Sequence, residues 1–281
     1  MNFIKLLTVY LRYYWQYFKF LRSAKTIYKL DSPYLYDFAK NVIEDKRYYY
    51  VFALMEWFRK QLKKDHTQIK VTDFGSGSLI HADNTRKISQ LAKHGSISNQ
   101  EGRLLFRIVR HFTPNTVLEL GTSIGISSIY IHAVNKQSTH LTVEGCEALA
   151  NVAKNNFERL KLKNIHLINV EFDAALDHLL EQNYQLDFCY LDGNHNEKAT
   201  IRYFKKLLPL FHEKSVLVIA DIYWSDSMIK AWESLQKRPE VKLTIDLFHF
   251  GLLLFDPKIK EKQNVKLARR STKPWQLGFR R

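Results

Sequence analysis

The sequence has little cysteine and no long uninterrupted hydrophobic run. Its two cysteines, Cys146 and Cys189, are too few for a disulfide framework, and both lie in apolar or strand-end contexts where a reduced packing role is expected. We therefore expect a reducing, cytoplasmic compartment. Charged side chains interrupt residues 1–23 at every second helical turn, which argues against a transmembrane helix; they are Lys5, Arg12, Lys19 and Arg22. The same segment has no small-residue cleavage site, which argues against a signal peptide.

Acidic residues are scarce at both ends of the chain. Residues 1–70 hold 14 Lys/Arg against 6 Asp/Glu and residues 256–281 hold 9 against 2, whereas residues 71–255 hold 20 of each. The net charge of +15 therefore lies on the two ends. A catalytic domain that follows a phosphate backbone usually carries basic residues on its own face, so this distribution argues against a nucleic-acid substrate.

The first segment, residues 1–23, predicts an amphipathic helix, because its polar residues recur at gaps of three and four. A wide apolar and aromatic face remains, made of Phe3, Ile4, Leu7, Leu11, Tyr14, Trp15, Phe18 and Leu21. Two interpretations stay open. Either the helix packs on its own domain or on a dimer partner, or residues 1–22 make peripheral contact with an anionic membrane surface.

The sequence lacks the Gly-x-Gly-x-x-Gly turn of dinucleotide enzymes, but it has a related motif. The apolar run 117–120 leads into a turn from Gly121 to Gly125, and a second apolar run ends at Glu144, nineteen residues after that turn. Glycines let backbone amides approach a ligand, and an acid at the end of the second strand can accept both hydroxyls of a ribose. The motif predicts a nucleotide-type cofactor site.

Apolar runs and helix-length segments alternate regularly after Pro114. Five runs predict parallel strands with helices on both faces of the sheet; they are 116–120, 140–144, 165–170, 186–191 and 215–220. Two further runs, 241–248 and 250–255, have almost no connection and predict an antiparallel hairpin. We expect an α/β fold with a Rossmann-like, mostly parallel seven-stranded sheet, a C-terminal antiparallel hairpin and an N-terminal helical extension.

The N-terminal part predicts helices over 34–42 and 47–62, and a capping box from Ser98 to Glu101 starts a helix through about His111. The stretch 71–78 also places an acid before a glycine, but no second strand ending in an acid follows it. We interpret it as a loop near the active site or a domain junction. The predicted domains are a basic, aromatic-rich helical extension or cap (1–97), a catalytic domain (98–256) and a basic, solvated or partly disordered tail (257–281).

The motif over 117–145 resembles the first two motifs of class I S-adenosylmethionine (SAM)-dependent methyltransferases. The resemblance implies that Glu119 and the glycine turn lie along the methionine part of SAM, and that Glu144 holds the ribose. The cofactor contacts it implies around this motif are Glu119, Gly121, Ser123, Gly125, Ser127, Glu144 and Gly145. The same resemblance makes the aromatic helix over 47–62 a candidate cap for the acceptor, with ordinary core packing as the alternative.

The segment after the third predicted strand matches the family position that flanks the adenine. Phe172 or Asp173 would fill that role. The alternative is that Asp173 is the N-cap of the helix that begins at Ala174, and both roles can coexist.

Polar side chains also follow the fourth and fifth predicted strands, at the edge where parallel sheets bind ligands. Asp192 and His195 follow the fourth strand, and Asp221 follows the fifth. Two acids and a histidine can hold a divalent cation, and His195 can act as a general base. A capping or structural role for His195 is the alternative.

These residues narrow the resemblance to O-methyltransferases of the catechol and macrocin type. In that pattern the acids matching Asp192 and Asp221 bind magnesium, Asp192 also borders the cofactor, and the residue three beyond the first acid, here His195, is the base. Catechol-type enzymes have an amide-bearing residue directly after the second acid. This chain has Ile222 there, so one metal ligand is missing or comes from elsewhere.

The sequence therefore predicts SAM-dependent O-methylation of a small-molecule or glycosyl hydroxyl, with Mg²⁺ assistance left open. The expected location is cytoplasmic, with association to a membrane surface and homodimer formation both left open. Two rival functions remain. One is an RNA or protein methyltransferase that docks through its basic termini, although the chain lacks the Asn/Asp-Pro-Pro-Tyr motif typical of base methylation. The other is a non-catalytic, membrane-recruited adaptor.

Overall fold

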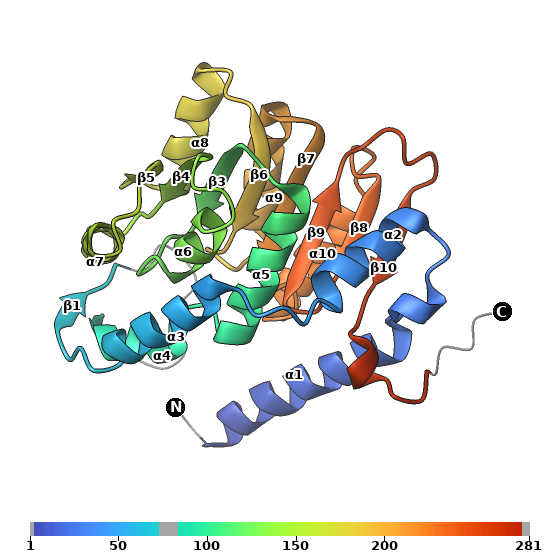
Figure 1. The fold of residues 1–281 in the computed structure, drawn as a ribbon, viewed down its shortest axis with the longest axis horizontal. Helices are drawn as coiled ribbons and strands as arrows, with labels where there is room; N and C mark the ends of the chain where they lie inside the picture. The colour runs from blue at the N-terminus through green and yellow to red at the C-terminus, as the bar shows by residue number, and fades with distance from the viewer. Residues whose placement is uncertain (1–2, 73–83, 277–281) are drawn as a thin grey trace.

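A mixed eight-stranded sheet forms the centre of the computed structural model, which describes residues 3–72 and 84–276 (Figure 1). Its strand order is β10-β8-β9-β7-β6-β3-β4-β5. The parallel part consists of β3 (Thr116–Leu120), β4 (Thr139–Val143), β5 (Ile165–Ile168), β6 (Leu186–Leu191) and β7 (Phe211–Ala220). The predicted hairpin is confirmed as β8 (Leu243–Asp246) and β9 (Phe250–Leu254), with β9 antiparallel to both β7 and β8.

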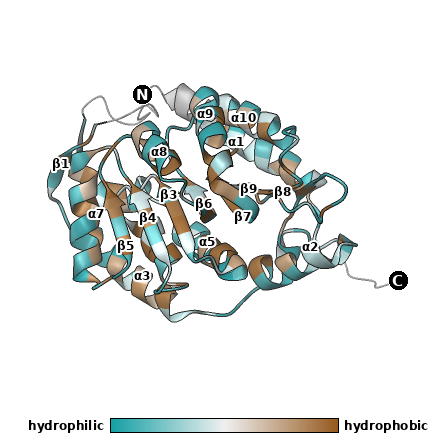
Figure 2. Ribbon diagram, turned by 90° about the horizontal axis from the view of Figure 1, so that it is seen from above, coloured by the Kyte–Doolittle hydropathy of each residue, from teal (hydrophilic) through white to brown (hydrophobic). Residues whose placement is uncertain are grey.

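Both faces of the sheet are apolar, because successive side chains of a strand point to opposite sides. In β6, Phe188 and Tyr190 face one core cluster, whereas Cys189 and Leu191 face the other. Figure 2 shows helices on both sides of the sheet. One side is covered by α8 (Phe172–Glu181), α9 (Glu197–Leu207) and α10 (Asp226–Gln236), and the other by α5 (Asn99–Phe112) and α2 (Pro33–Phe38). The predicted sheet with helices on both faces is confirmed.

Four further helices form most of a third apolar cluster, which Ile165 and Leu167 of β5 join. It contains α3 (Tyr50–Leu62), α4 (Ile88–His94), α6 (Ile126–His132) and α7 (Glu147–Arg159). The N-terminal helices begin and end close to their predicted positions, except that α2 continues into a π-helical turn over Ala39–Ile43. Strands β1 (Gln68–Lys70) and β2 (Thr85–Lys87) pair antiparallel. The predicted capping box is present, since Ser98 and Glu101 each accept a hydrogen bond from the other's backbone amide.

Helix α1 (Phe3–Ser23) packs one side of its C-terminal half on the protein itself. The rings of Tyr13, Tyr17 and Phe20 surround Phe248, with ring centroids 4.8–5.5 Å apart. Packing on its own domain, which was one of the two interpretations for this segment, is therefore observed. Within the described part of the chain, no helix is long and apolar enough to cross a bilayer.

The described C-terminal residues 263–276 pack on the protein, so for them the prediction of a solvated or partly disordered tail is wrong. Residues Gln263–Lys266 form β10, which pairs parallel with β8 and adds an eighth strand to the seven predicted. Leu267 and Ala268 are buried, and the buried Lys273 donates a hydrogen bond to the carbonyl oxygen of Ala24. The physical reason is the edge of β8, whose unpaired backbone groups are satisfied by an added strand.

Candidate functional site

A cavity of about 460 Å³ opens at the carboxyl ends of β3, β4 and β6. This volume lies in the range of small-molecule sites. Its wall brings together turns that are far apart in the sequence: Gly121, Thr122, Ser123, Ser127, Glu144, Gly145, Phe172, Asp173, Asp192, Gly193, Asn194, His195, Arg202 and Tyr203, with Val71, Thr72 and Ser96 on the N-terminal side. The loop predicted over 71–78 thus reaches the cavity at Val71 and Thr72, and its remainder lies outside the described residues.

The glycine turn is shaped by contacts with its neighbours in the fold. Gly121 has φ +111°, and a Cβ placed there would lie 1.9 Å from the carbonyl oxygen of Asp192. Gly125 has φ +84°, and a Cβ there would meet the ring of Phe157 at 2.6 Å. Both positions therefore require glycine. Gly121 lines the cavity, whereas Gly125 packs behind it against Phe157, and the cofactor contact that the resemblance implies for Gly125 stays a prediction.

Glu144 at the end of β4 has a fixed carboxylate. Its Oε2 accepts a hydrogen bond from the amide of Ser123 at 2.8 Å, and its Oε1 accepts one from the amide of Cys146 at 2.9 Å. The side chain is buried, which raises the pKa of Glu144 above its ordinary value. Each oxygen keeps a lone pair for another donor, so this carboxylate can still accept hydroxyl groups from the cavity.

Glu119 lies behind the cavity wall, fully buried in β3. One carboxylate oxygen accepts hydrogen bonds from the hydroxyls of Thr142 and Ser128. Its other oxygen, Oε1, has no hydrogen-bond partner among the described residues. This acid fixes the strand and helix that carry the turn, and its predicted contact with the cofactor stays a prediction.

Phe172 and Asp173 lie where helix α8 begins. Glu171 is the N-cap residue, and Asp173 belongs to the first turn, so the alternative that Asp173 caps this helix is wrong. The Asp173 carboxylate instead forms ion pairs with Arg202 at 2.9 Å and Lys206 at 3.0 Å. The Phe172 ring packs edge-on against Tyr203, which gives this part of the cavity two aromatic walls.

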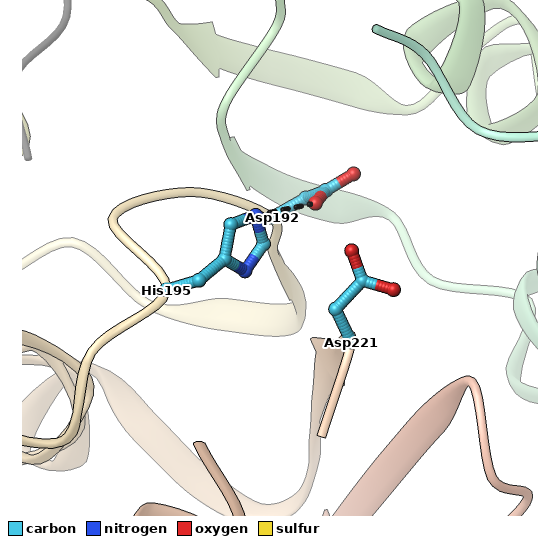
Figure 3. Close-up of side chains that lie close together, drawn as sticks. All are labelled: Asp192, His195 and Asp221. Atoms are coloured by element: carbon cyan, nitrogen blue, oxygen red, sulfur yellow. Dashed lines mark ion pairs between the residues drawn. The ribbon is translucent and has the colours of Figure 1, made fainter. Parts of the chain in front are cut away.

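Asp192, His195 and Asp221 meet at the ends of β6 and β7 (Figure 3). Each offers one ligand atom, and these atoms lie within 4.8 Å of one another. Nε2 of His195 is 3.7 Å from Oδ1 of Asp192, whose other oxygen accepts a hydrogen bond from the hydroxyl of Tyr190 at 2.9 Å. Asp192 and His195 line the cavity, whereas Asp221 lies beyond its wall.

The raised pKa values of the two carboxyl groups favour a cation bound in this cluster. Burial, together with the nearby Asp221 carboxylate, raises the pKa of Asp192 to about 6, against the lowering effect of His195. Burial also raises the pKa of Asp221. Two carboxylates and an imidazole are a suitable donor set for a divalent cation. Ile222 occupies the position of the catechol-type amide. It is fully buried, and its side chain has no atom that binds a metal.

A polar cluster beside Asp221 was missed by the sequence analysis. Nδ1 of His249 lies 2.8 Å from Oε1 of Glu101, and the hydroxyl of Tyr13 lies 3.4 Å from the same nitrogen. The backbone amide of Asp221 donates to the carbonyl oxygen of His249 at 2.8 Å. Burial alone would raise the pKa of Glu101, but the hydrogen bond and charge of His249 lower it to about 2. The capping box gave Glu101 a local role, and no spacing in the sequence linked it to His249.

The predicted aromatic cap is also corrected. Of the residues that the structure describes, none in α3 lines the cavity. Phe52 of this helix packs in the core against Phe106 and Tyr130. The alternative of ordinary core packing therefore holds for the buried side of α3.

The middle of the chain matches a known domain family. Residues 118–222 match the family model described as a methyltransferase domain. No curated protein sequence matches the chain. The resemblance to class I methyltransferases, first drawn from the glycine turn and Glu144, agrees with this match, and solved methyltransferase structures share the fold.

Three of these solved structures illustrate the likeness. The O-methyltransferase from Bacillus cereus in complex with SAH is 19% identical, with 63% of this chain and 93% of that chain covered and a TM-score of 0.50. TomG, an O-methyltransferase from Streptomyces achromogenes involved in tomaymycin synthesis and in complex with SAM, is 20% identical, with coverage of 57% and 82% and a TM-score of 0.50. The SAH-bound methyltransferase PaMTH1 from Podospora anserina is 12% identical, with coverage of 75% and 99% and a TM-score of 0.51.

Proposed function

We propose that the protein is a SAM-dependent methyltransferase that transfers a methyl group to a hydroxyl oxygen of a small-molecule or glycosyl acceptor. One observation carries the proposal: Glu144 with the glycine turn, and Asp192 with His195, belong to the wall of the same cavity. Methyl transfer is an in-line displacement that needs donor and acceptor held together. A carboxylate suited to a ribose and a proton acceptor in one space meet that need.

The cofactor half of the cavity is assigned to the residues around the glycine turn. Glu144 accepts the ribose hydroxyls, while Gly121, Ser123, Ser127 and Gly145 border the rest of the nucleoside and the methionine part. Phe172 and Asp173 flank the adenine, with the Phe172 ring as an apolar wall. Glu119 and Gly125 act from behind the wall as positioning residues. In this proposal residues 98–256 form the catalytic domain.

The acceptor half is assigned to Asp192 and His195. The acceptor oxygen forms a bond to the methyl carbon as the bond from that carbon to sulfur breaks, and the sulfonium becomes a neutral thioether. The hydroxyl proton passes to the imidazole of His195, which Asp192 orients. Asp192 and Asp221 would hold a divalent cation such as Mg²⁺, which when bound supplies positive charge that lowers the pKa of the acceptor hydroxyl, and the imidazole of His195 stays free to take the proton.

The solved relatives support oxygen as the accepting atom. The Bacillus cereus and Streptomyces achromogenes proteins are both named O-methyltransferases, and their structures hold SAH and SAM, respectively. The neutral charge of residues 71–255 also favours a small acceptor over a nucleic acid.

The first test is titration calorimetry of SAM with protein freed of cofactor. We expect binding to the wild type and at least a roughly thirtyfold weaker affinity for Glu144→Ala, because hydrogen bonds to a charged group are lost. Glu147→Ala is the matched control, since Glu147 is exposed three residues further along the chain. Absence of SAM binding by the wild type, or equal affinities for the wild type and Glu144→Ala, would contradict the proposal.

The second test concerns the cation. Chelation should lower methyl transfer, and added magnesium should restore it. Asp221→Asn should lose this response, whereas Asp226→Asn, an exposed acid in α10 that pairs with Arg12, should keep it. Activity that is indifferent to both treatments would leave the acids as polar contacts of the acceptor.

A further inference from the structure

The outer side of helix α1 carries a stripe of exposed aromatic and aliphatic side chains. Leu11 is 60% exposed, Tyr14 65%, Trp15 56% and Phe18 51%. Their spacing of three and four residues places them on one face of the helix, and Arg22 continues the same face one turn later. We call these five residues the α1 stripe. A run of large apolar groups of this kind is uncommon on a free protein surface.

Packing of α1 on its own protein does not need the stripe. The opposite face supplies Tyr13, Tyr17 and Phe20, whose rings surround Phe248. Arg12 adds an ion pair with Asp226 of α10 at 2.9 Å. The helix is therefore fixed by contacts on its inner face, and it lies along one edge of the molecule (Figure 1) with the aromatic side chains of the stripe exposed.

The fold also places residues 24–28, just beyond α1, beside residues 266–273 of the C-terminal basic segment. Residues 1–30 hold six Lys/Arg and residues 262–281 hold seven, and neither segment contains an acid. The backbone amide of Lys25 donates to Lys266 at 2.7 Å, and Nζ of Lys273 donates to the carbonyl oxygen of Ala24. Exposed cations therefore collect where α1 ends; they are Arg22, Lys25, Lys29, Arg269 and Arg270.

A second exposed aromatic group completes this end of the surface. Trp275 is 69% exposed, and its neighbour Gln276 accepts a hydrogen bond from the hydroxyl of Thr26, just beyond α1. Tyr28, 48% exposed, is bonded by Arg270. Trp and Tyr are the side chains enriched at the boundary between lipid and water.

We infer that the α1 stripe, together with the cations and Trp275 at its C-terminal end, is a docking surface for an anionic lipid bilayer. The aromatic side chains enter the headgroup region, and the acid-free basic segments face the negative surface of the lipid. Charge complementarity identifies the occupant, because the exposed cations Arg22, Lys25, Lys29 and Arg269 oppose self-association and match an anionic surface. The inference goes beyond the proposed methyl transfer and does not depend on it.

The test is co-sedimentation of the full chain with vesicles of phosphatidylcholine, alone or with phosphatidylglycerol as about a third of the lipid. We expect binding to the mixed vesicles to be at least about tenfold stronger, and to weaken as salt rises. The variant Trp15→Ser with Phe18→Ser should bind at least about tenfold less tightly. Removing one charge by Arg22→Gln or Lys29→Gln should reduce binding about fivefold.

The matched control is Trp57→Ser, which removes an equally exposed tryptophan, 49% accessible, from helix α3 away from the surface. It should bind vesicles like the wild type, and all variants should keep the wild-type circular dichroism spectrum and melting temperature. Three results would overturn the inference. They are no binding to the mixed vesicles, equal binding by the Trp15/Phe18 variant, and a dimer in solution that this variant dissolves while vesicles are ignored. The last result would assign the stripe to a second copy of the chain.

Discussion

The two halves of the cavity are built by different means. Around Glu144 the first half comes from one stretch of chain, Gly121 to Cys146, with Phe172 and Asp173 as its outer wall, and backbone amides hold the Glu144 carboxylate on both oxygens. The half around Asp192 comes from two separate strand ends, and side-chain charges hold it together. The first half is a satisfied hydrogen-bonding surface. The second is a partly buried pair of carboxylates beside an imidazole.

In the proposed function, this difference separates the residues that bind the cofactor from those that take part in methyl transfer. A carboxylate fixed by backbone amides keeps its geometry whatever ligand arrives, which suits recognition of a constant cofactor. Asp192 and Asp221 are two neighbouring, partly buried carboxylates with raised pKa values, so a proton or a cation bound between them would stabilise them. Groups perturbed in this way concentrate where protons are moved. We therefore expect substitutions in the two halves to affect different constants.

The largest effect is expected for His195→Ala, which should change kcat while leaving the affinity for SAM almost unchanged. Loss of the proton acceptor should lower kcat by a factor of about 10² to 10⁴. The affinity for SAM measured by calorimetry should stay within about twofold, because the cofactor half is untouched. His178→Ala, an exposed histidine in α8, is the matched control and should leave both constants unchanged. If His195→Ala turned over at the wild-type rate, His195 would have no part in proton transfer.

A substitution at Gly121 should affect SAM binding and turnover together, because this residue contacts both halves of the cavity. A methyl group there meets the carbonyl oxygen of Asp192 at 1.9 Å, and the φ of +111° disfavours any side chain. Gly121→Ala should therefore lower the free energy of unfolding by about 3 kcal/mol and weaken SAM binding and turnover together. Chemical denaturation measures the first effect and calorimetry the second.

Gly95→Ala is the control for the stability measurement. Its new methyl group would lie 3.1 Å from the flexible Leu91 side chain, and its φ is negative. The cost should stay below about 1 kcal/mol. Equal losses of stability for the two variants would show that the Gly121 contact with Asp192 is not a tight one.

The sequence predicted the fold well where periodicity is strong. The strands β3, β4, β6 and β7 were read from long apolar runs, and the hairpin from two runs with almost no connection. Strand β10 was missed because Gln263–Lys266 contains a single apolar residue, Val265. Its formation depends on the free edge of β8, which no local pattern of the tail encodes.

The same contrast applies to the two halves of the cavity. Spacing along one segment was enough to place Glu144 on the cavity wall, because a strand, a turn and a second strand fix its position. Spacing along the sequence does not show how deeply a side chain is buried. Glu119 was therefore expected on the cavity wall, although it lies beneath the turn. The pair of Glu101 and His249 joins α5 to the hairpin between β8 and β9, and only the folded sheet reveals it.

The smallest effect is expected at the outer wall of the cofactor half, where Asp173 pairs with Arg202 and Lys206. The partners are partly exposed, so Asp173→Asn should cost less than about 1 kcal/mol at neutral pH. These ion pairs lower the pKa of Asp173 below its ordinary 3.8, despite the opposing effect of burial. Their stabilisation is thus present above pH 3.8 and is lost as the pH falls through the lowered value. Denaturation curves of the two proteins should therefore converge in acid, and a gap that persists at low pH would indicate that Asp173 acts through packing.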